Sequence, residues 1–121
     1  MEFSFPFEKL RVWQETRPWI RSIYALSRDF PAEERFGLVS QLNRAAVSVA
    51  ANLAEGSARM SRKDQAHFYQ QAYSSAMECM CLLILAADQS YLSQETLQTQ
   101  RETTGRISSM INALRNSALG A

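Results

Sequence analysis

The sequence is poor in the residues that bind metals or form disulfides, with one histidine and two cysteines among 121 residues. Cys79 and Cys81 lie two positions apart on what we expect to be a helix, so their side chains diverge by about 200° and cannot bond to each other. His67 belongs to no cluster with the spacing of a metal site. We therefore expect free thiols, a reducing compartment, and neither a metal nor another cofactor.

Long apolar runs and a leader pattern are missing too. The longest apolar run, Met80–Ala87, is far shorter than the roughly 20 residues needed to cross a bilayer. The start, MEFSFPFEK, has no basic stretch followed by an apolar run, so we expect no signal peptide, no membrane contact and a cytoplasmic location. The net charge is only +1, with the excess of Lys and Arg in the first half of the chain. Glu78 has no second carboxylate or histidine beside it in the pattern, which argues against an enzyme.

The sequence shows clear helical periodicity. Its length of 121 residues suits one domain, residues 1–121, with a single core. Pro18 predicts a bend in the first helix. Gly56 is interpreted as the C-cap of the second, and Ser61 and Ser93 as the N-caps of the third and fourth. The apolar stripes place the helices at about 8–29, 35–55, 62–88 and 94–116. Long amphipathic helices with short links predict an all-α, antiparallel up-down-up-down four-helix bundle.

One edge of the helix at 35–55 carries a row of polar side chains, here called the polar ladder: Gln41, Arg44, Ser48, Asn52 and Glu55. A spacing of three or four residues makes them neighbours along the helix. We favour a network that is satisfied inside the protein, because buried polar groups normally find partners there; a ligand site is the alternative. Glu78 is assigned to the same network, with Arg44 as its expected partner.

The helix at 62–88 has two apolar faces. The core face comprises Phe68, Ala72, Ser75, Cys79, Leu82, Leu83 and Ala86. The opposite face comprises Tyr73, Met77, Met80 and Ile84. A single four-helix core has no place for this second face, so it predicts a homo-oligomer interface. We expect a row of mostly small side chains on the helix at 35–55 to contribute to it: Asn43, Val47, Ala50, Ala51 and Ala54.

Two groups of cations are candidates for contacts with phosphates. The first, here called the basic cluster, is Arg59, Arg62 and Lys63, at a link and the following helix start. A solvated loop is the alternative, although an oligomer would repeat the cluster in every subunit. The second group lies on the first helix and comprises Arg17 and Arg21, with Arg11 and Arg28. Trp13 and Trp19, which interleave with these arginines, are interpreted as core or interface anchors rather than base-stacking platforms.

Short segments along nearly the whole chain match one known family. The most specific are Gln41-Leu42-Asn43-Arg44-Ala45-Ala46 and Asn52-Leu53-Ala54-Glu55-Gly56; Phe7–Gln14, Phe30-Pro31, Phe36-Gly37-Leu38, Ser61-Arg62-Lys63 and Tyr91-Leu92-Ser93 accompany them. Together they resemble the four-helix bundle proteins encoded in 23S rRNA intervening sequences. The resemblance implies a small homo-oligomer, typically a ring of five subunits, often basic and suspected of binding nucleic acid. A related branch, the accessory protein of diversity-generating retroelements, partners a reverse transcriptase.

Two functions follow from the residues and the resemblance together. The first is a non-enzymatic homo-oligomer, a pentamer by the resemblance, that associates with RNA or DNA through its basic clusters without reading the sequence. The second is a scaffold that holds a partner protein, such as a nucleic-acid enzyme. The chain departs from the family in two respects. Ala50 and Ala51 stand where members commonly carry proline and serine, and its charge is lower than that of the strongly basic branch.

Overall fold

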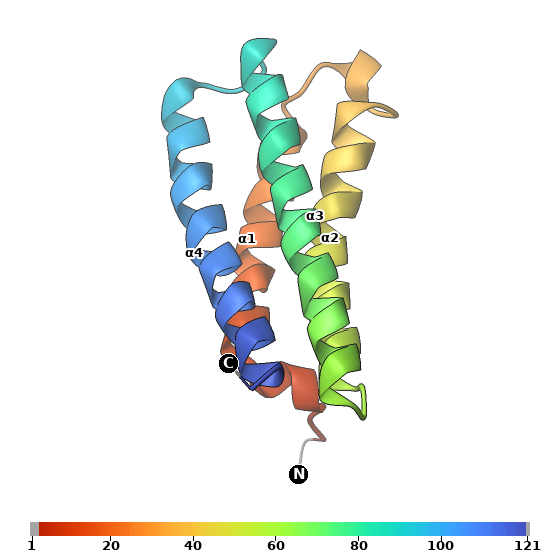
Figure 1. The fold of residues 1–121 in the computed structure, drawn as a ribbon. Helices are drawn as coiled ribbons and strands as arrows, with labels where there is room; N and C mark the ends of the chain where they lie inside the picture. Colours follow the sequence, from red (N-terminus) through yellow and green to blue (C-terminus); the bar gives the residue numbers. More distant parts are fainter. Residues whose placement is uncertain (1–2, 121) are drawn as a thin grey trace.

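A computed structural model describes residues 3–120, which contain four α-helices and no strand (Figure 1). The all-α prediction with four helices is confirmed. Short 3₁₀ turns, η1 and η2, precede the first two helices. The elements in order are η1 (Pro6–Lys9), α1 (Arg11–Ser27), η2 (Ala32–Glu34), α2 (Leu38–Ser57), α3 (Arg62–Asp88) and α4 (Gln94–Ala118). None of the helices described is long and apolar enough to cross a membrane.

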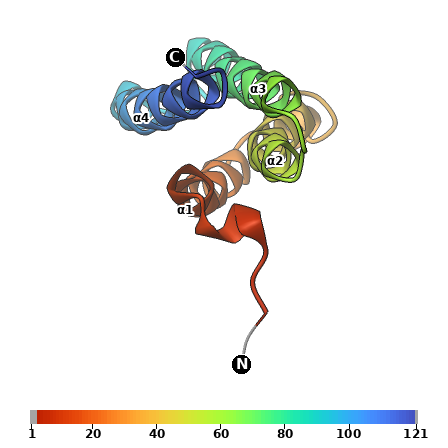
Figure 2. The same cartoon turned by 60° about the horizontal axis from the view of Figure 1, so that its bottom comes forward.

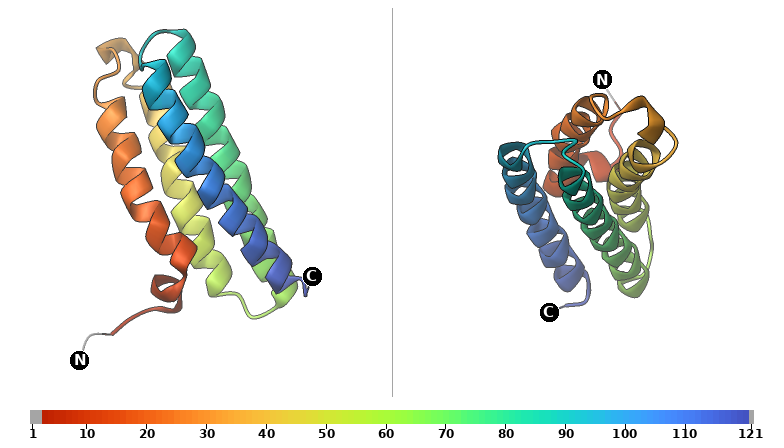
Figure 3. Two further views of the ribbon diagram at one scale, coloured as in Figure 1. Left: turned by 90° about the vertical axis from the view of Figure 1, so that its left-hand side faces the viewer. Right: turned by 90° about the horizontal axis from the view of Figure 1, so that it is seen from above.

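The chain ends and the α2–α3 link lie at one end of the helices, and η2 and the α3–α4 link lie at the other (Figure 1). Seen along the helices, α2 lies between α1 and α3, and α4 lies beside α3 (Figures 2 and 3). Cross-links join α1 to α4 as well: the indole Nε1–H of Trp19 donates to Thr104 Oγ1 at 3.0 Å, and Arg106 pairs with Glu15 at 3.0 Å. The four helices therefore enclose one core.

The core is built from the stripes that helical periodicity predicted. Leu42, Ala46, Val49 and Leu53 of α2 are fully buried, which confirms that this helix is central. The other helices each add fully buried side chains, among them Ile23 of α1, Ala72, Ala76, Cys79 and Leu83 of α3, and Ile107 and Ile111 of α4. Phe68 and Ser75, which were expected in the core face of α3, are only half-buried. Tyr69 and Ala76, each one position further along the helix, are buried in the core instead.

The helix starts follow the expected capping chemistry. Ser61 Oγ accepts from the Asp64 N–H at 3.0 Å, and Ser93 Oγ accepts from the Thr96 N–H at 3.0 Å. The first predicted helix is divided at Leu10, whose extended backbone separates η1 from α1. The second begins at Leu38 rather than at residue 35, because residues 32–34 form the 3₁₀ turn η2.

Gly56 is not the C-cap of α2, which corrects the sequence interpretation. The helix continues to Ser57, and the capping residue is Ala58, in a right-handed conformation. Gly56 is buried, and a Cβ built on it would lie 2.5 Å from Cε1 of Tyr69 and 2.8 Å from Cδ1. Because no real Cβ fits at such a distance, glycine is needed here for the close approach of α3, not for the turn of the chain.

Candidate nucleic-acid interface

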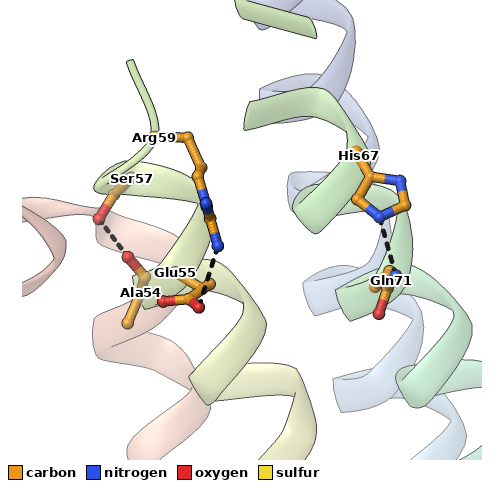
Figure 4. Close-up of polar contacts among 6 residues, drawn as sticks. All are labelled: Ala54, Glu55, Ser57, Arg59, His67 and Gln71. Atoms are coloured by element: carbon orange, nitrogen blue, oxygen red, sulfur yellow. Dashed lines mark hydrogen bonds and ion pairs between the residues drawn. The ribbon is translucent and has the colours of Figure 1, made fainter. Parts of the chain in front are cut away.

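The basic cluster surrounds the start of α3. All three of its side chains are exposed, and Met60, between them, is 99% exposed. The Arg59 side chain contacts its own protein surface. Its guanidinium is 3.3 Å from Glu55 Oε1 (Figure 4) and 4.4 Å from the centre of the Phe68 ring. Arg62 and Lys63 form no ion pair within 4.0 Å with any carboxylate that the structure describes. Among the residues that the structure describes, no carboxylate therefore neutralises these two cations.

Arg62 and Lys63 are the first two residues of a 27-residue helix. Cations are disfavoured at this position, because the free N–H groups of a helix start carry partial positive charge. An anion bound there would meet both the N–H groups and the two side chains. His67, one turn further on, is exposed and shares a hydrogen bond of 3.0 Å with Gln71 (Figure 4). It takes no part in the cluster.

Arg17 and Arg21 form a second basic patch, on the outer surface of α1. Both side chains are exposed, and the Arg17 guanidinium lies 5.6 Å from the centre of the Trp13 ring. Neither arginine pairs with a carboxylate among the described residues, whereas Arg11 is bound to Glu15 at 3.4 Å. Because this patch and the basic cluster lie on different helices, the sequence prediction corresponds to two surfaces rather than one.

Charge is distributed unequally between the two ends of the bundle. The described segments near the end with the chain termini are η1, the first turns of α1 and α3, the last turns of α2 and α4, and the α2–α3 link (Figure 1). They carry the cations Lys9, Arg11, Arg59, Arg62, Lys63 and Arg115 and the carboxylates Glu8, Glu15, Glu55 and Asp64, and Arg106 pairs with Glu15. At the opposite end, η2, the links beside it, the end of α3 and the start of α4 carry the carboxylates Asp29, Glu33, Glu34, Asp88 and Glu95, with the cations Arg28 and Arg35. The first end is therefore basic and the second acidic, although the net charge of the chain is only +1. The sequence pattern did not indicate this, because the residues of each end come from separate segments.

The polar ladder divides into a bonded part and an exposed part. The half-buried Ser48 shares a 2.9 Å hydrogen bond with Ser75 of α3, and Asn52 Nδ2 donates to Ser48 O and Ser48 Oγ at 2.9 and 3.0 Å. Gln41, Arg44 and Glu78 are exposed and line an open depression of about 330 Å³ between α2 and α3. The expected Arg44–Glu78 ion pair is absent from the described ion pairs. Because both side chains are exposed to water, neither charge needs the other as a partner.

The second apolar face of α3 is less exposed than the sequence indicated. Tyr73, Met80 and Ile84 are partly buried and pack against the core, which corrects the expectation that a single bundle has no place for them. Met77 alone of the four is exposed, at 39%. Among the small side chains of α2, Asn43 accepts a hydrogen bond from Ser27 Oγ at 3.2 Å, so that end of the row packs against α1. Val47 and Ala51 remain exposed.

Three ionisable groups are clearly perturbed: burial raises the pKa of Tyr69, whose ring packs against Gly56 near the basic cluster, and the other two lie elsewhere. Burial, and secondarily the charge of Glu78, raises the pKa of the Cys79 thiol to about 12. The Tyr91 hydroxyl donates to Glu34 Oε2 at 3.0 Å, and this bond raises the pKa of Tyr91. Residues 3–120 contain no group of three or more His, Cys, Asp or Glu arranged to hold a metal ion.

Comparisons with known proteins identify relatives of the fold and of the sequence. The model of a family described as 23S rRNA-intervening sequence protein matches residues 8–113. A crystal structure from Bacteroides thetaiotaomicron, of a protein with unknown function from the S23 ribosomal protein family, superposes with a TM-score of 0.80. It is 21% identical, and the match covers 87% of this chain and 95% of that one. At that identity the likeness concerns the fold alone. The search of curated proteins found no match.

Proposed function

The chain belongs to the family of 23S rRNA-intervening sequence proteins, and from this premise we propose that it is a non-enzymatic, oligomeric four-helix bundle that binds RNA or DNA through its basic end. The family resemblance seen in the sequence motifs is confirmed by this membership. We further propose an antiparallel up-down-up-down arrangement and a cytoplasmic location, where the two thiols stay reduced.

One observation supports nucleic-acid binding above the others. Arg62 and Lys63 lie at a helix start, where cations reduce stability, and no carboxylate within residues 3–120 forms an ion pair with either side chain. They also lie at the basic end of the molecule. A phosphate would relieve this repulsion and would accept from the free N–H groups as well. Phosphate contacts carry no sequence information, so the binding is sequence-independent.

The test is a salt titration of binding to labelled RNA, duplex DNA and single strands, followed by fluorescence anisotropy. The logarithm of affinity should fall with the logarithm of salt concentration at a slope of about −0.9 per phosphate contacted on duplex DNA and about −0.7 on single strands. Arg62→Ala and Lys63→Ala should each flatten that slope. Arg101→Ala removes the same charge from the exposed surface of α4 and serves as the control. Absence of binding at about 50 mM salt would refute the proposal.

An oligomer is proposed because apolar side chains remain exposed on the outer faces of two neighbouring helices. Val47 of α2 is exposed, as are Met77 and Leu85 of α3. We propose a homo-oligomer, a pentamer in line with the family resemblance, with these residues at the interface. Light scattering should give a multiple of 13.7 kDa. The double change Met77→Glu and Leu85→Glu should yield helical monomers, and a wild-type monomer at micromolar concentration would refute the assembly.

The second candidate is a scaffold that holds a partner protein, such as a nucleic-acid enzyme. The depression lined by Gln41, Arg44 and Glu78 favours it, because it offers both signs of charge and an amide on one open surface. Binding to a protein at this surface should depend on Arg44 and Glu78. It should survive the loss of Arg62 and Lys63, which separates it from the first candidate.

A further inference from the structure

Aromatic rings at the start of the chain form a continuous series. Phe3 meets Phe5 edge-to-face with ring centres 5.0 Å apart, Phe5 lies parallel to Phe7 at 5.9 Å, and Phe7 meets Trp13 edge-to-face at 4.8 Å. The Arg17 guanidinium stands over the Trp13 ring. We call the residues Phe3, Phe5 and Phe7 the aromatic arm. It extends the surface of α1, with its second basic patch, beyond the end of the helix.

The aromatic arm is held in a defined conformation. The Phe5 N–H donates to Glu8 Oε2 at 2.6 Å, and Gln14 Nε2 donates to the Glu8 main-chain oxygen at 2.7 Å. These bonds tie the arm to η1 and η1 to α1. A ligand that binds the arm therefore finds the rings already placed, so less conformational freedom is lost on binding.

The outer rings of the arm are open to solvent. Phe3 is 81% exposed and Phe5 is 51% exposed, whereas Phe7 is half-buried. The N-terminal segment lies at the same end of the molecule as the α2–α3 link, where the basic cluster is (Figures 1 and 3), and Lys9 is the last residue of η1. Exposed flat apolar faces at the end of the molecule with more cations than carboxylates suit a ligand with flat rings and negative charges.

Phe36 provides a comparison within the same molecule. It is 88% exposed, but it follows Glu33 and Glu34 at the acidic end and contacts only the guanidinium of Arg35 among the described aromatic and cationic groups. An anionic ligand would be repelled there. Both ends of the molecule therefore have exposed phenylalanine side chains, but cations predominate at one end and carboxylates at the other.

We propose that Phe3 and Phe5 are stacking platforms for the bases of single-stranded RNA or DNA, whose phosphates lie on the neighbouring cations. The inference rests on the proposed function and adds a preference for unpaired strands. Every base presents a π-face, so stacking on these rings is tolerant of sequence. In a duplex the faces are covered by neighbouring base pairs, so the platforms favour single strands.

The test compares a single-stranded oligonucleotide with a duplex of the same length at one salt concentration. Phe3→Ala with Phe5→Ala should weaken single-strand binding by at least about fivefold, since base–aromatic stacking contributes that much or more per base. Duplex binding should change by less than twofold. Phe36→Ala, which removes an equally exposed ring at the acidic end, should change neither.

Several outcomes would overturn the inference. Equal loss on single strands and duplex, or no loss on either, would show that the rings do not stack on bases. A fall in the mass of the assembly in the Phe3→Ala, Phe5→Ala protein would show that the rings serve a second copy of the chain. The proposed function fails separately, when wild-type protein binds no nucleic acid or when Arg62→Ala and Lys63→Ala leave the salt slope unchanged.

Discussion

Replacing Gly56 with alanine should destabilise the protein, whereas the same replacement at Gly105 should stabilise it. Both glycines lie inside α-helices, where alanine is favoured by up to about 1 kcal/mol. At Gly105, an added Cβ would meet nothing within 4 Å, so the whole gain should be realised. At Gly56, it would lie 2.5 and 2.8 Å from ring atoms of Tyr69 and 3.2 Å from the Cβ of Phe68. Both neighbours then have to move.

The cost of the clash at Gly56 sets the sign of its effect. Overpacking a filled interior costs about 1–3 kcal/mol, which exceeds the helix gain, so the net loss should be about 1 kcal/mol, within a range of 0–2. The free energies of unfolding of the two variants, measured in urea by circular dichroism, should therefore differ by about 1–3 kcal/mol. In a domain of this size, 1 kcal/mol corresponds to roughly 4 °C in Tm.

A double-mutant cycle identifies the cause. In a Tyr69→Ala background the ring is gone, so Gly56→Ala should become neutral or stabilising, as at Gly105. If Gly56→Ala stabilises the otherwise unchanged protein as much as Gly105→Ala does, α3 does not approach α2 as closely as described. A cycle without coupling between positions 56 and 69 would refute the explanation even if the single change is destabilising.

Three further predictions concern polar groups that are buried or half-buried. Thr104→Val should cost about 1–3 kcal/mol in urea unfolding, because the Trp19 indole N–H loses its acceptor in the core, and Thr104→Ser should cost less because it keeps the hydroxyl. Asn52→Ala should cost about 1 kcal/mol by the same assay. It should cost less in a Ser48→Ala background, which has already lost one of the two hydrogen bonds. Additive losses at the two positions would refute the network. Raising the pH from about 9 towards 12 should lower the free energy of unfolding, because the Cys79 thiol has its ordinary pKa of 9.0 only in the unfolded chain. Cys79→Ala should reduce this pH dependence.

Much of the fold could be predicted because it depends on local patterns. The apolar stripes gave four helices, and the serines at 61 and 93 marked two helix starts through bonds to residues three positions away. The interpretation of Gly56 was wrong because glycine suits both a helix end and a close helix contact. Only the position of Tyr69, on another helix, decides between them.

The candidate site was predictable as a set of residues but not as an arrangement. The basic cluster is contiguous in sequence, so it could be found by inspection. Which cations form ion pairs depends on side-chain rotamers. Arg59 pairs with Glu55, whereas Arg62, three residues later, pairs with no carboxylate of the described residues. The expected pairing of Arg44 with Glu78 required both to be buried, and solvent exposure is a property of the assembled bundle. The aromatic arm was overlooked because its phenylalanines precede any recognisable helix.

The separation of charge between the two ends changes what the small net charge means. The longest helix, with 27 residues, spans about 40 Å. At physiological ionic strength the Debye length is about 8 Å, so a phosphate at the basic end is screened from the carboxylates at the other. In about 0.01 M salt the Debye length grows to about 30 Å, and the acidic end then offsets part of the attraction. For the proposed binding, the local charge of one end matters more than the net charge, and we expect the molecule to approach a polyanion with its basic end first.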